Sequence, residues 1–433
     1  MISFESQPSW GARLMVKKPM IFCSIFILMF LCGFVGGQET WLGDQQGLWS
    51  FSPSESHPLS DLPADLRCIA RTPSGGGWVA LSDINLILHV DPTGDILETI
   101  DTVVGVQGLV VDSEGSVWAT RPGMDDVIVI EPGNGIVANH PVATVPYGIT
   151  INQQGQICVT CSYSNQVQIL SPTGDLLQLI PVGFFPTGIT AAHDGGLWIA
   201  EKDGLRKLDS SGETTWSGSA GVFPIGVTTD LQGRAWFSCQ NSQQVVVVDG
   251  SGVVNIIDVP ARPLGISGNG DGSVTVLCRN GNSVVRISST GQILDQITAS
   301  YPVGTGDLSG LQRVLMVDPD GDMDGDGVAN AVEAQLGFNP LNDDSCPVTF
   351  VRGDANRDGM VDFTDGIDAL IILFGAGSTN CLESLDVDDD GRLTLADPIR
   401  ILDHVLASGP APEFPYPDLG PDLDPDQGFP CFP

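Results

Sequence analysis

Basic residues are scarce in this sequence. Its 433 residues include 18 lysines and arginines against 53 aspartates and glutamates, which gives a net charge of −35. Nucleic-acid binding depends on lysine and arginine side chains that neutralise phosphates, so this composition excludes nucleic acid as a partner. The acidic excess is concentrated from Asp318 onward, where 116 residues contain 25 acidic residues, four arginines and no lysine.

A run of apolar residues long enough to cross a bilayer is also missing, because a spanning helix needs about 20 residues. The apolar run at 20–35 is shorter, follows Lys17 and Lys18 and ends in two glycines. These features are typical of a signal peptide, with a membrane anchor as the alternative. We therefore predict a signal peptide over residues 1–37, and a mature protein that is secreted, periplasmic or on the cell surface without a stable membrane span.

An internal repeat occupies the middle of the chain. A glycine recurs every 38 to 40 residues, at Gly108, Gly148, Gly188, Gly226, Gly265 and Gly304. Each repeat contains four short runs of β-forming residues separated by turns, and several have a tryptophan ten residues after the glycine. Four strands in about 40 residues make the blade of a β-propeller, whereas a β-sandwich, the alternative, does not repeat at a fixed period.

The two ends of the repeat region are needed to complete the ring. Six full repeats run from 65 to 300, the segment 301–317 supplies two more strands, and residues 41–62 supply the missing pair. Joining both ends in one blade removes the exposed strand edges. We therefore predict an all-β fold, a seven-bladed β-propeller over 41–317, followed by a small α-helical module.

The motifs of the repeat resemble those of the NHL and streptogramin-lyase-like propellers of secreted bacterial proteins. Shared motifs are proline-x-glycine-isoleucine at Pro146–Ile149, aspartate-glycine at Asp194–Gly195 and leucine-tryptophan at Leu197–Trp198. Lyases of the family that this chain resembles carry a histidine beside the repeat glycine and a glutamate after the tryptophan strand, so the resemblance implies catalytic residues at these two positions. Both residues would lie near the mouth of the central channel.

This chain lacks that pair of catalytic residues. The residues before the glycines are Gln107, Tyr147, Thr187, Ile225, Leu264 and Val303. Thirteen residues after the glycine, only Glu201 is acidic. Acid–base catalysis needs titratable groups placed near each other, so the pattern favours a binding protein over an enzyme.

Three cysteines occupy the same repeat position as Glu201, at Cys161, Cys239 and Cys278. Small buried thiols are the simpler interpretation, and a disulfide or a metal site is the alternative. Cys158-x-x-Cys161 lacks the second cysteine pair that a zinc site needs. His193 lies in a turn, where an exposed histidine is expected more than a catalytic one.

Two acidic segments match the twelve-residue calcium loop of EF-hand proteins. Such a loop supplies oxygen ligands from positions 1, 3, 5, 9 and 12 and from the carbonyl of position 7. The predicted ligands are Asp354, Asn356, Asp358, Met360, Asp362 and Asp365 in the first loop, and Asp386, Asp388, Asp390, Arg392, Thr394 and Asp397 in the second. Apolar runs at 367–374 and 399–406 predict a helix after each loop.

The two loop–helix units resemble type I dockerins, which bind cohesins in assemblies that degrade polysaccharides. The resemblance covers 352–408 and rests on the 32-residue spacing, the aspartate at position 12 and the lack of an entering helix. It implies a cohesin-like or other cell-surface protein, or a polysaccharide, as partner. Dockerins often carry Ser-Thr at loop positions 10 and 11, where this chain has Phe363-Thr364 and Leu395-Ala396.

A third acidic stretch, 318–345, resembles a thrombospondin type 3 calcium repeat, with a solvated linker as the alternative. Its predicted ligands are Asp322, Asp324, Asp326, Val328, Asn330 and Glu333. Residues 409–433, rich in proline and aspartate, are expected to form an extended tail. We expect Cys381 and Cys431 to pair with each other or with Cys346.

Together these features predict a secreted protein that binds Ca²⁺. Its propeller would bind protein or glycan, and its dockerin-like module would dock onto a partner when calcium is bound, in a setting such as polysaccharide degradation. The alternative is a lyase- or lactonase-type enzyme whose active site lies at the mouth of the propeller channel.

Overall fold

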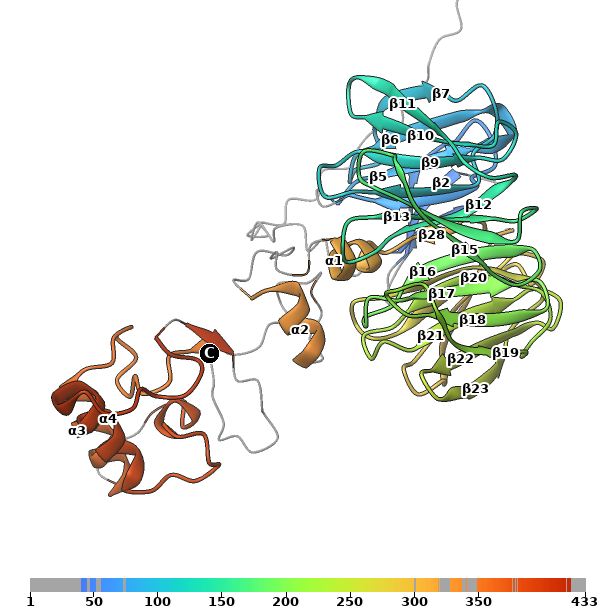
Figure 1. Ribbon diagram of the computed structural model, residues 1–433. Coiled ribbons are helices and arrows are strands. Elements are labelled where there is room, and N and C mark those ends of the chain that lie inside the picture. The colour runs from blue at the N-terminus through green and yellow to red at the C-terminus, as the bar shows by residue number, and fades with distance from the viewer. Residues whose placement is uncertain are drawn as a thin grey trace, which may run out of the picture. The chain divides into compact units, whose positions relative to one another are not determined.

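The computed structural model describes residues 40–44, 47–51, 56–72, 75–299, 301–317, 319, 328–336, 340, 349–375, 377, 379, 381–417 and 419–421. The predicted signal peptide lies outside these ranges. No helix in the described ranges is both long enough and apolar enough to cross a membrane. Figure 1 shows a propeller of β-sheets and a small helical module, which we describe separately.

Seven sheets follow one another along the chain as the blades of a propeller (Figure 1). Blade 1 contains β1 (Thr40–Asp44), β2 (Gly47–Phe51) and β3 (Ser56–Ser60), and blade 2 contains β4 (Cys68–Arg71), β5 (Gly77–Leu81), β6 (Leu86–Val90) and β7 (Ile96–Asp101), with β28 (Gly306–Asp307). Blades 3 to 5 have four strands each: β8 (Gly108–Val111), β9 (Val117–Arg121), β10 (Asp126–Glu131) and β11 (Gly135–Pro141) in blade 3; β12 (Pro146–Ile151), β13 (Ile157–Cys161), β14 (Gln166–Leu170) and β15 (Leu176–Pro181) in blade 4; and β16 (Pro186–Ala191), β17 (Leu197–Glu201), β18 (Gly204–Leu208) and β19 (Thr214–Gly218) in blade 5. Blades 6 and 7 also have four strands each: β20 (Pro224–Thr229), β21 (Ala235–Cys239), β22 (Gln244–Asp249) and β23 (Gly252–Asp258) in blade 6, and β24 (Pro263–Gly268), β25 (Val274–Cys278), β26 (Ser283–Ile287) and β27 (Ile293–Thr298) in blade 7. The predicted seven-bladed propeller is confirmed.

The ring closes between the two ends of the propeller sequence, but not as predicted. Blade 1 takes three strands from 40–60, and Val303 fills its innermost position by exchanging backbone hydrogen bonds of 2.9 and 2.8 Å with Gly43. The prediction of two strands in 301–317 is wrong. The short β28 pairs with β4 of blade 2, and helix α1 (Leu311–Val317) follows it.

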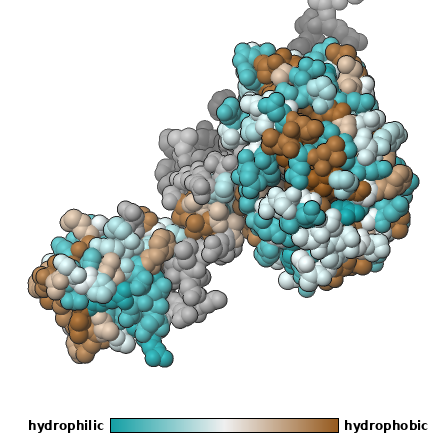
Figure 2. All heavy atoms as spheres, viewed as in Figure 1, coloured by the Kyte–Doolittle hydropathy of each residue, from teal (hydrophilic) through white to brown (hydrophobic). Residues whose placement is uncertain are grey.

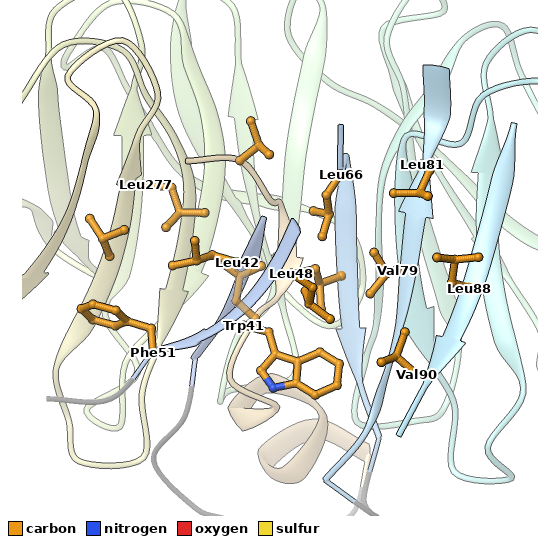
Figure 3. Close-up of a cluster of buried hydrophobic side chains, with 14 residues drawn as sticks. Trp41, Leu42, Leu48, Phe51, Leu66, Val79, Leu81, Leu88, Val90 and Leu277 are labelled. Atoms are coloured by element: carbon orange, nitrogen blue, oxygen red, sulfur yellow. The ribbon is translucent and has the colours of Figure 1, made fainter. Parts of the chain in front are cut away.

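Apolar side chains from three blades fill the closing junction (Figure 3). Trp41 and Leu48 of blade 1 are buried together with Val79 and Leu81 of blade 2 and Leu277 of blade 7. Burial of apolar surface is the main favourable term in folding. The N-terminal blade is therefore held by packing against both of its neighbours, in addition to the two hydrogen bonds at Val303.

The repeat glycines lie on innermost strands, where adjacent blades approach most closely. A Cβ atom at Gly188 would lie 2.3 Å from the Ile225 carbonyl oxygen, and one at Gly148 would lie 2.5 Å from the Thr187 oxygen. Thr160 Oγ1 links β12 to β16, since it accepts a hydrogen bond from the Gly148 N–H at 2.8 Å and donates one to the Thr187 carbonyl at 2.6 Å. The glycine of the motif is thus required by backbone contact between blades.

Helix α1 packs on the end of the central channel where the innermost strands finish. Leu311 is fully buried there. Gln312 accepts a hydrogen bond from Thr190 Oγ1 at 2.7 Å and donates one to Thr229 Oγ1 at 2.6 Å. One side chain of α1 therefore bridges blades 5 and 6.

The C-terminal module contains the two loop–helix units. Helices α3 (Phe363–Leu373) and α4 (Ala396–Ala407) pack around Ala369, Leu385 and Ile401. Both helices begin earlier than predicted; Asp362 caps α3 by accepting a hydrogen bond from the Thr364 N–H. The remaining elements are α2 (Asn330–Leu336), the 3-10 helices η1 (Ser82–Ile84) and η2 (Glu383–Leu385), and strands β29 (Thr349–Phe350) and β30 (Gly420–Pro421).

Residues 409–421 do not form the expected extended tail. Strand β30 pairs with β29, and the buried Arg352 guanidinium donates to the Phe414 carbonyl at 2.7 Å. His404 Nε2 and the Tyr416 hydroxyl are 2.7 Å apart. This part of the tail therefore packs on the module, while 422–433 lie outside the described residues.

Candidate functional site

The innermost strands begin around the end of the channel opposite α1, which we call the channel mouth. The residues that occupy the pre-glycine position there are Arg67, Gln107, Tyr147, Thr187, Ile225, Leu264 and Val303. Arg67 Nη2 donates to the Tyr147 hydroxyl at 3.1 Å, and Gln107 Nε2 is buried without a hydrogen-bond partner. A cavity of about 100 Å³ extends from Gln107 and Tyr147 along the repeat glycines to Gln312.

Glu201, the one acid at the predicted lyase position, is engaged by its neighbours. It is buried, forms an ion pair with Arg206 and accepts a hydrogen bond from the Gly183 N–H at 2.7 Å. Blade 3 has the same pair with the charges exchanged, Arg121 Nε to Asp126 Oδ1 at 2.8 Å. The position therefore joins the second and third strands of a blade, and the Glu201 carboxylate is engaged in an ion pair within its own blade.

The cysteines at this position are buried free thiols. Cys161, Cys239 and Cys278 have no exposed surface, and burial raises the pKa of each thiol to about 12. A thiol that keeps its proton is neither a nucleophile nor a metal ligand. These cysteines form no disulfide in the described structure, and they fill strand positions as small apolar side chains.

His193 differs from the expectation of an exposed turn residue. It is half-buried, its Nε2 has no hydrogen-bond partner, and burial lowers its pKa. Asp230 and Asp194 oppose that shift. Asp230 forms an ion pair with Arg234 at 2.6 Å, and its carboxylate is therefore engaged by the arginine and not by His193.

The two acidic loops share their internal hydrogen bonds position by position. The position-1 carboxylate accepts from the N–H groups of positions 5 and 6: Asp354 from Asp358 (3.1 Å) and Gly359 (2.9 Å), and Asp386 from Asp390 (3.2 Å) and Gly391 (2.8 Å). The position-12 carboxylate accepts from the position-9 N–H at 2.8 Å: Asp365 from Asp362, and Asp397 from Thr394. Both position-6 glycines have positive φ, which allows the sharp turn between these contacts.

Negative charge is concentrated in these loops. Carboxylate oxygens of Asp386, Asp388 and Asp390 lie within 4.8 Å of one another. Burial raises the pKa of Asp386 and of Asp388, and repulsion from the nearby carboxylate of Asp397 adds to both shifts. Burial also raises the pKa of Asp365 in the first loop. This donor set, hard oxygens with excess negative charge, fits Ca²⁺.

A neighbouring acidic group has a different explanation. Glu383 and Asp389 lie near Asp386, but the buried Arg352 pairs with Glu383 at 3.1 Å and with Asp389 at 3.0 Å. Arg352 Nη1 also donates to the Asp386 carbonyl at 2.7 Å. Arg352 therefore fixes the start of the second loop and neutralises the carboxylates outside the predicted ligand set.

The other predicted ligands are less informative. Met360 and Arg392 have exposed side chains and would contribute only their carbonyl oxygens. Of the third acidic stretch, Val328, Asn330 and Glu333 are buried, whereas the predicted ligands Asp322, Asp324 and Asp326 lie outside the described residues. Cys381 is disulfide-bonded, and both of its expected partners also lie outside the described residues.

Exposed apolar side chains occupy equivalent positions in the two units. They are Phe363, Ile367 and Phe374 in the first unit and, at the matching positions of the second unit, Leu395, Ile399 and Leu406, all between 38 and 71% exposed. We call these two sets the apolar stripes. Figure 2 shows apolar residues gathered on one side of the helical module. Contiguous exposed apolar surface of this kind marks interaction sites.

Two residues at the mouth were not recognised from the sequence. Arg67 occupies the seventh pre-glycine position, but its blade has Cys68 in place of the glycine. Arg279 directly follows Cys278, the position that corresponds to Glu201. Extending the repeat one period upstream would have identified Arg67. Reading one residue beyond the position that corresponds to Glu201 would have identified Arg279.

The fold and the channel mouth define a seven-bladed propeller of the lyase-like type. The chain belongs to the virginiamycin B lyase family, whose model matches residues 53–305. No curated protein matches the sequence significantly.

Solved structures with the same fold include two lyases and a variant of one of them. Virginiamycin B lyase from Staphylococcus aureus is 22% identical, with a TM-score of 0.50 over 56% of this chain and 89% of that one. A streptogramin B lyase is 20% identical, with a TM-score of 0.53 over 62% and 91%. A catalytically inactive histidine-to-alanine variant of the Staphylococcus aureus enzyme, with quinupristin, is 20% identical with a TM-score of 0.51 over 56% and 89%. At these identities the likeness shows the fold alone.

Proposed function

We propose that this chain is a secreted calcium-binding protein whose propeller binds a ligand and whose C-terminal module docks onto a partner. The observation that carries the proposal is the repetition of one design in two units, with the same carboxylate contacts and the same exposed apolar positions in each. A duplicated loop and a duplicated surface together favour a module whose calcium loops support a binding face.

Calcium would be held by the six predicted ligands of each loop, and the third acidic stretch would add a further site. The ion would supply the positive charge that the buried carboxylates lack. Asp354 and Asp386 fix the turn of each loop, while Asp365 and Asp397 join the loop to the following helix. Each loop would therefore couple ion binding to the position of its apolar stripe.

The apolar stripes favour a partner protein whose binding surface is apolar over one whose surface is polar. Phe363 and Leu395 stand where the polar Ser-Thr pair of dockerins often lies, and both are exposed. We propose a cohesin-like or other cell-surface protein as the partner, with a polysaccharide as the other candidate. Secretion places such a protein where calcium is available.

Capture experiments test the docking proposal. The full chain is immobilised and exposed to proteins from the secreted extract, with calcium and with chelator. We expect capture only with calcium, and loss of capture for Phe363→Ser combined with Leu395→Ser. Leu419→Ser, an exposed apolar residue of the same module outside the stripes, is the control. Capture that persists in chelator contradicts the proposal.

Membership of the virginiamycin B lyase family favours a second candidate function, lyase activity. The mouth has no histidine at the pre-glycine positions, whereas a relative is inactive without one of its histidines. We expect no turnover of quinupristin by the full chain. Turnover that Glu201→Gln abolishes would make the protein an enzyme and overturn the binding role of the mouth.

A further inference from the structure

A second cavity, of about 120 Å³, adjoins the channel mouth where blades 1, 2 and 7 meet. Its polar lining residues are Asp65, Arg67, Ser82, Asp83 and Arg279. A cavity of this size is large enough for water or for the carboxylate group of a ligand. The cavity belongs to the mouth but lies beside the central channel.

The two arginines differ from four other arginines of the propeller. Arg121, Arg206, Arg234 and Arg286 are each paired with a carboxylate. Within the described chain, Arg67 and Arg279 have no carboxylate at ion-pair distance. A chain with a net charge of −35 has no shortage of such partners.

Few of the five guanidinium donors of each of these arginines are used within the described residues. Arg67 donates to the Tyr147 hydroxyl at 3.1 Å. The Arg279 guanidinium lies 4.3 Å from the ring centroid of Tyr301, and its Nε is buried without a hydrogen-bond partner. The Nη nitrogens carry the remaining donors of Arg279, and an acceptor in the cavity that this residue lines would satisfy them.

The lining defines the chemistry of that ligand. The planar fork of arginine matches a carboxylate through paired hydrogen bonds. Asp65 and Asp83 only accept hydrogen bonds, so the groups beside the carboxylate must be donors, and a second anionic group inside the same cavity is excluded. Sugar hydroxyls satisfy this condition. Exposed rings of Tyr163 and Phe184 on other mouth loops provide apolar surface for further sugar units.

We propose that this cavity binds the carboxylate of an acidic sugar, a uronate unit of a polysaccharide, through Arg67 and Arg279. The proposal rests on the proposed role of the propeller as a binding platform and names the class of its ligand. Arg67 stands at the pre-glycine position of blade 2, so in this blade a position at the channel mouth carries a positive charge.

Calorimetric titration of the full chain tests this inference. The ligands are a trimer of galacturonate and its methyl ester, which replaces each carboxylate by a neutral ester, and alanine as a small zwitterion. We expect the acid to bind and the ester to bind at least about tenfold more weakly. Arg279→Gln and Arg67→Gln should each weaken binding of the acid by about tenfold or more. Arg262→Gln should leave it unchanged within about twofold, because Arg262 does not line the cavity.

The outcomes separate this inference from the platform itself. The carboxylate site is overturned, and a glycan platform remains, if acid and ester bind equally. The same conclusion follows if the Arg279→Gln variant has an unchanged thermal transition and binds the acid as tightly as the native protein does. Binding of alanine overturns the sugar as ligand. Failure of both trimers to bind, while calcium-dependent capture persists, overturns the glycan platform but not the docking module. If Arg279→Gln does not fold, Arg67→Lys, which keeps the charge and loses the fork, decides the matter by its weaker binding.

Discussion

At the residue scale, the repeat glycines determine how closely the blades approach. Gly188→Ala should lower the free energy of unfolding by about 1–3 kcal/mol, because its Cβ would meet the Ile225 carbonyl oxygen at 2.3 Å. Urea denaturation of the full chain measures this change. Gly250→Ala is the control, since a Cβ there meets nothing within 4 Å, and its effect should stay within about 0.5 kcal/mol. Equal effects of the two substitutions would contradict the steric role of the repeat position.

His193 makes the stability of the propeller depend on pH. Burial lowers its pKa below the ordinary value of 6.5, so the unfolded chain binds more protons than the folded one between the two values. The stability that the neutral imidazole contributes is therefore present above pH 6.5 and is lost as the pH falls below it. The difference in unfolding free energy between the native protein and His193→Gln should narrow between about pH 7.5 and 5.5. A difference that does not change with pH would show that burial does not set this pKa.

At the element scale, α1 contributes to stability by joining two blades. Gln312 bonds Thr190 and Thr229, so Gln312→Ala should cost about 1–2 kcal/mol of unfolding free energy. A double-mutant cycle with Thr190→Val isolates the bond between the two side chains. We expect the double variant to lose less than the sum of the single losses. Strict additivity would mean that the hydrogen bond between Thr190 and Gln312 contributes nothing.

The strands of the complete blades could be predicted because each blade repeats its local pattern of turns and β-forming residues. The closing elements could not. The segment 311–317 is a short apolar run, which periodicity alone does not assign to helix or strand, and contacts with blades 5 and 6 hold it as a helix. The calcium loops were recognisable because the ligands of each loop lie within one short segment. Arg67 and Arg279, by contrast, come from opposite ends of the propeller sequence and meet only in the closed ring.

At the scale of the whole molecule, the propeller and the C-terminal module depend on different forces. The propeller has extended cores of buried side chains in every blade, such as the junction around Trp41 and Leu277. The core of the module is small, with Ala355, Val387 and Ile401 among its few fully packed residues. Small cores usually need a metal or a disulfide to fold. Calcium should therefore change the stability of the module and leave that of the propeller unchanged.

Asp386→Ala in the full chain tests this division. Without an ion the carboxylates of Asp386, Asp388 and Asp390 repel one another, and calcium binding would act as folding free energy for the module. We expect two thermal transitions with calcium, of which chelator removes or lowers only the one that belongs to the module. Asp386→Ala should weaken calcium binding by about tenfold or more and reduce the helical circular dichroism at limiting calcium. Asp368→Ala, which removes an acid outside the ligand set, should change neither. A module transition that is insensitive to chelator would show that the loops do not bind calcium, and a shift of the propeller transition would show that the two parts do not fold independently.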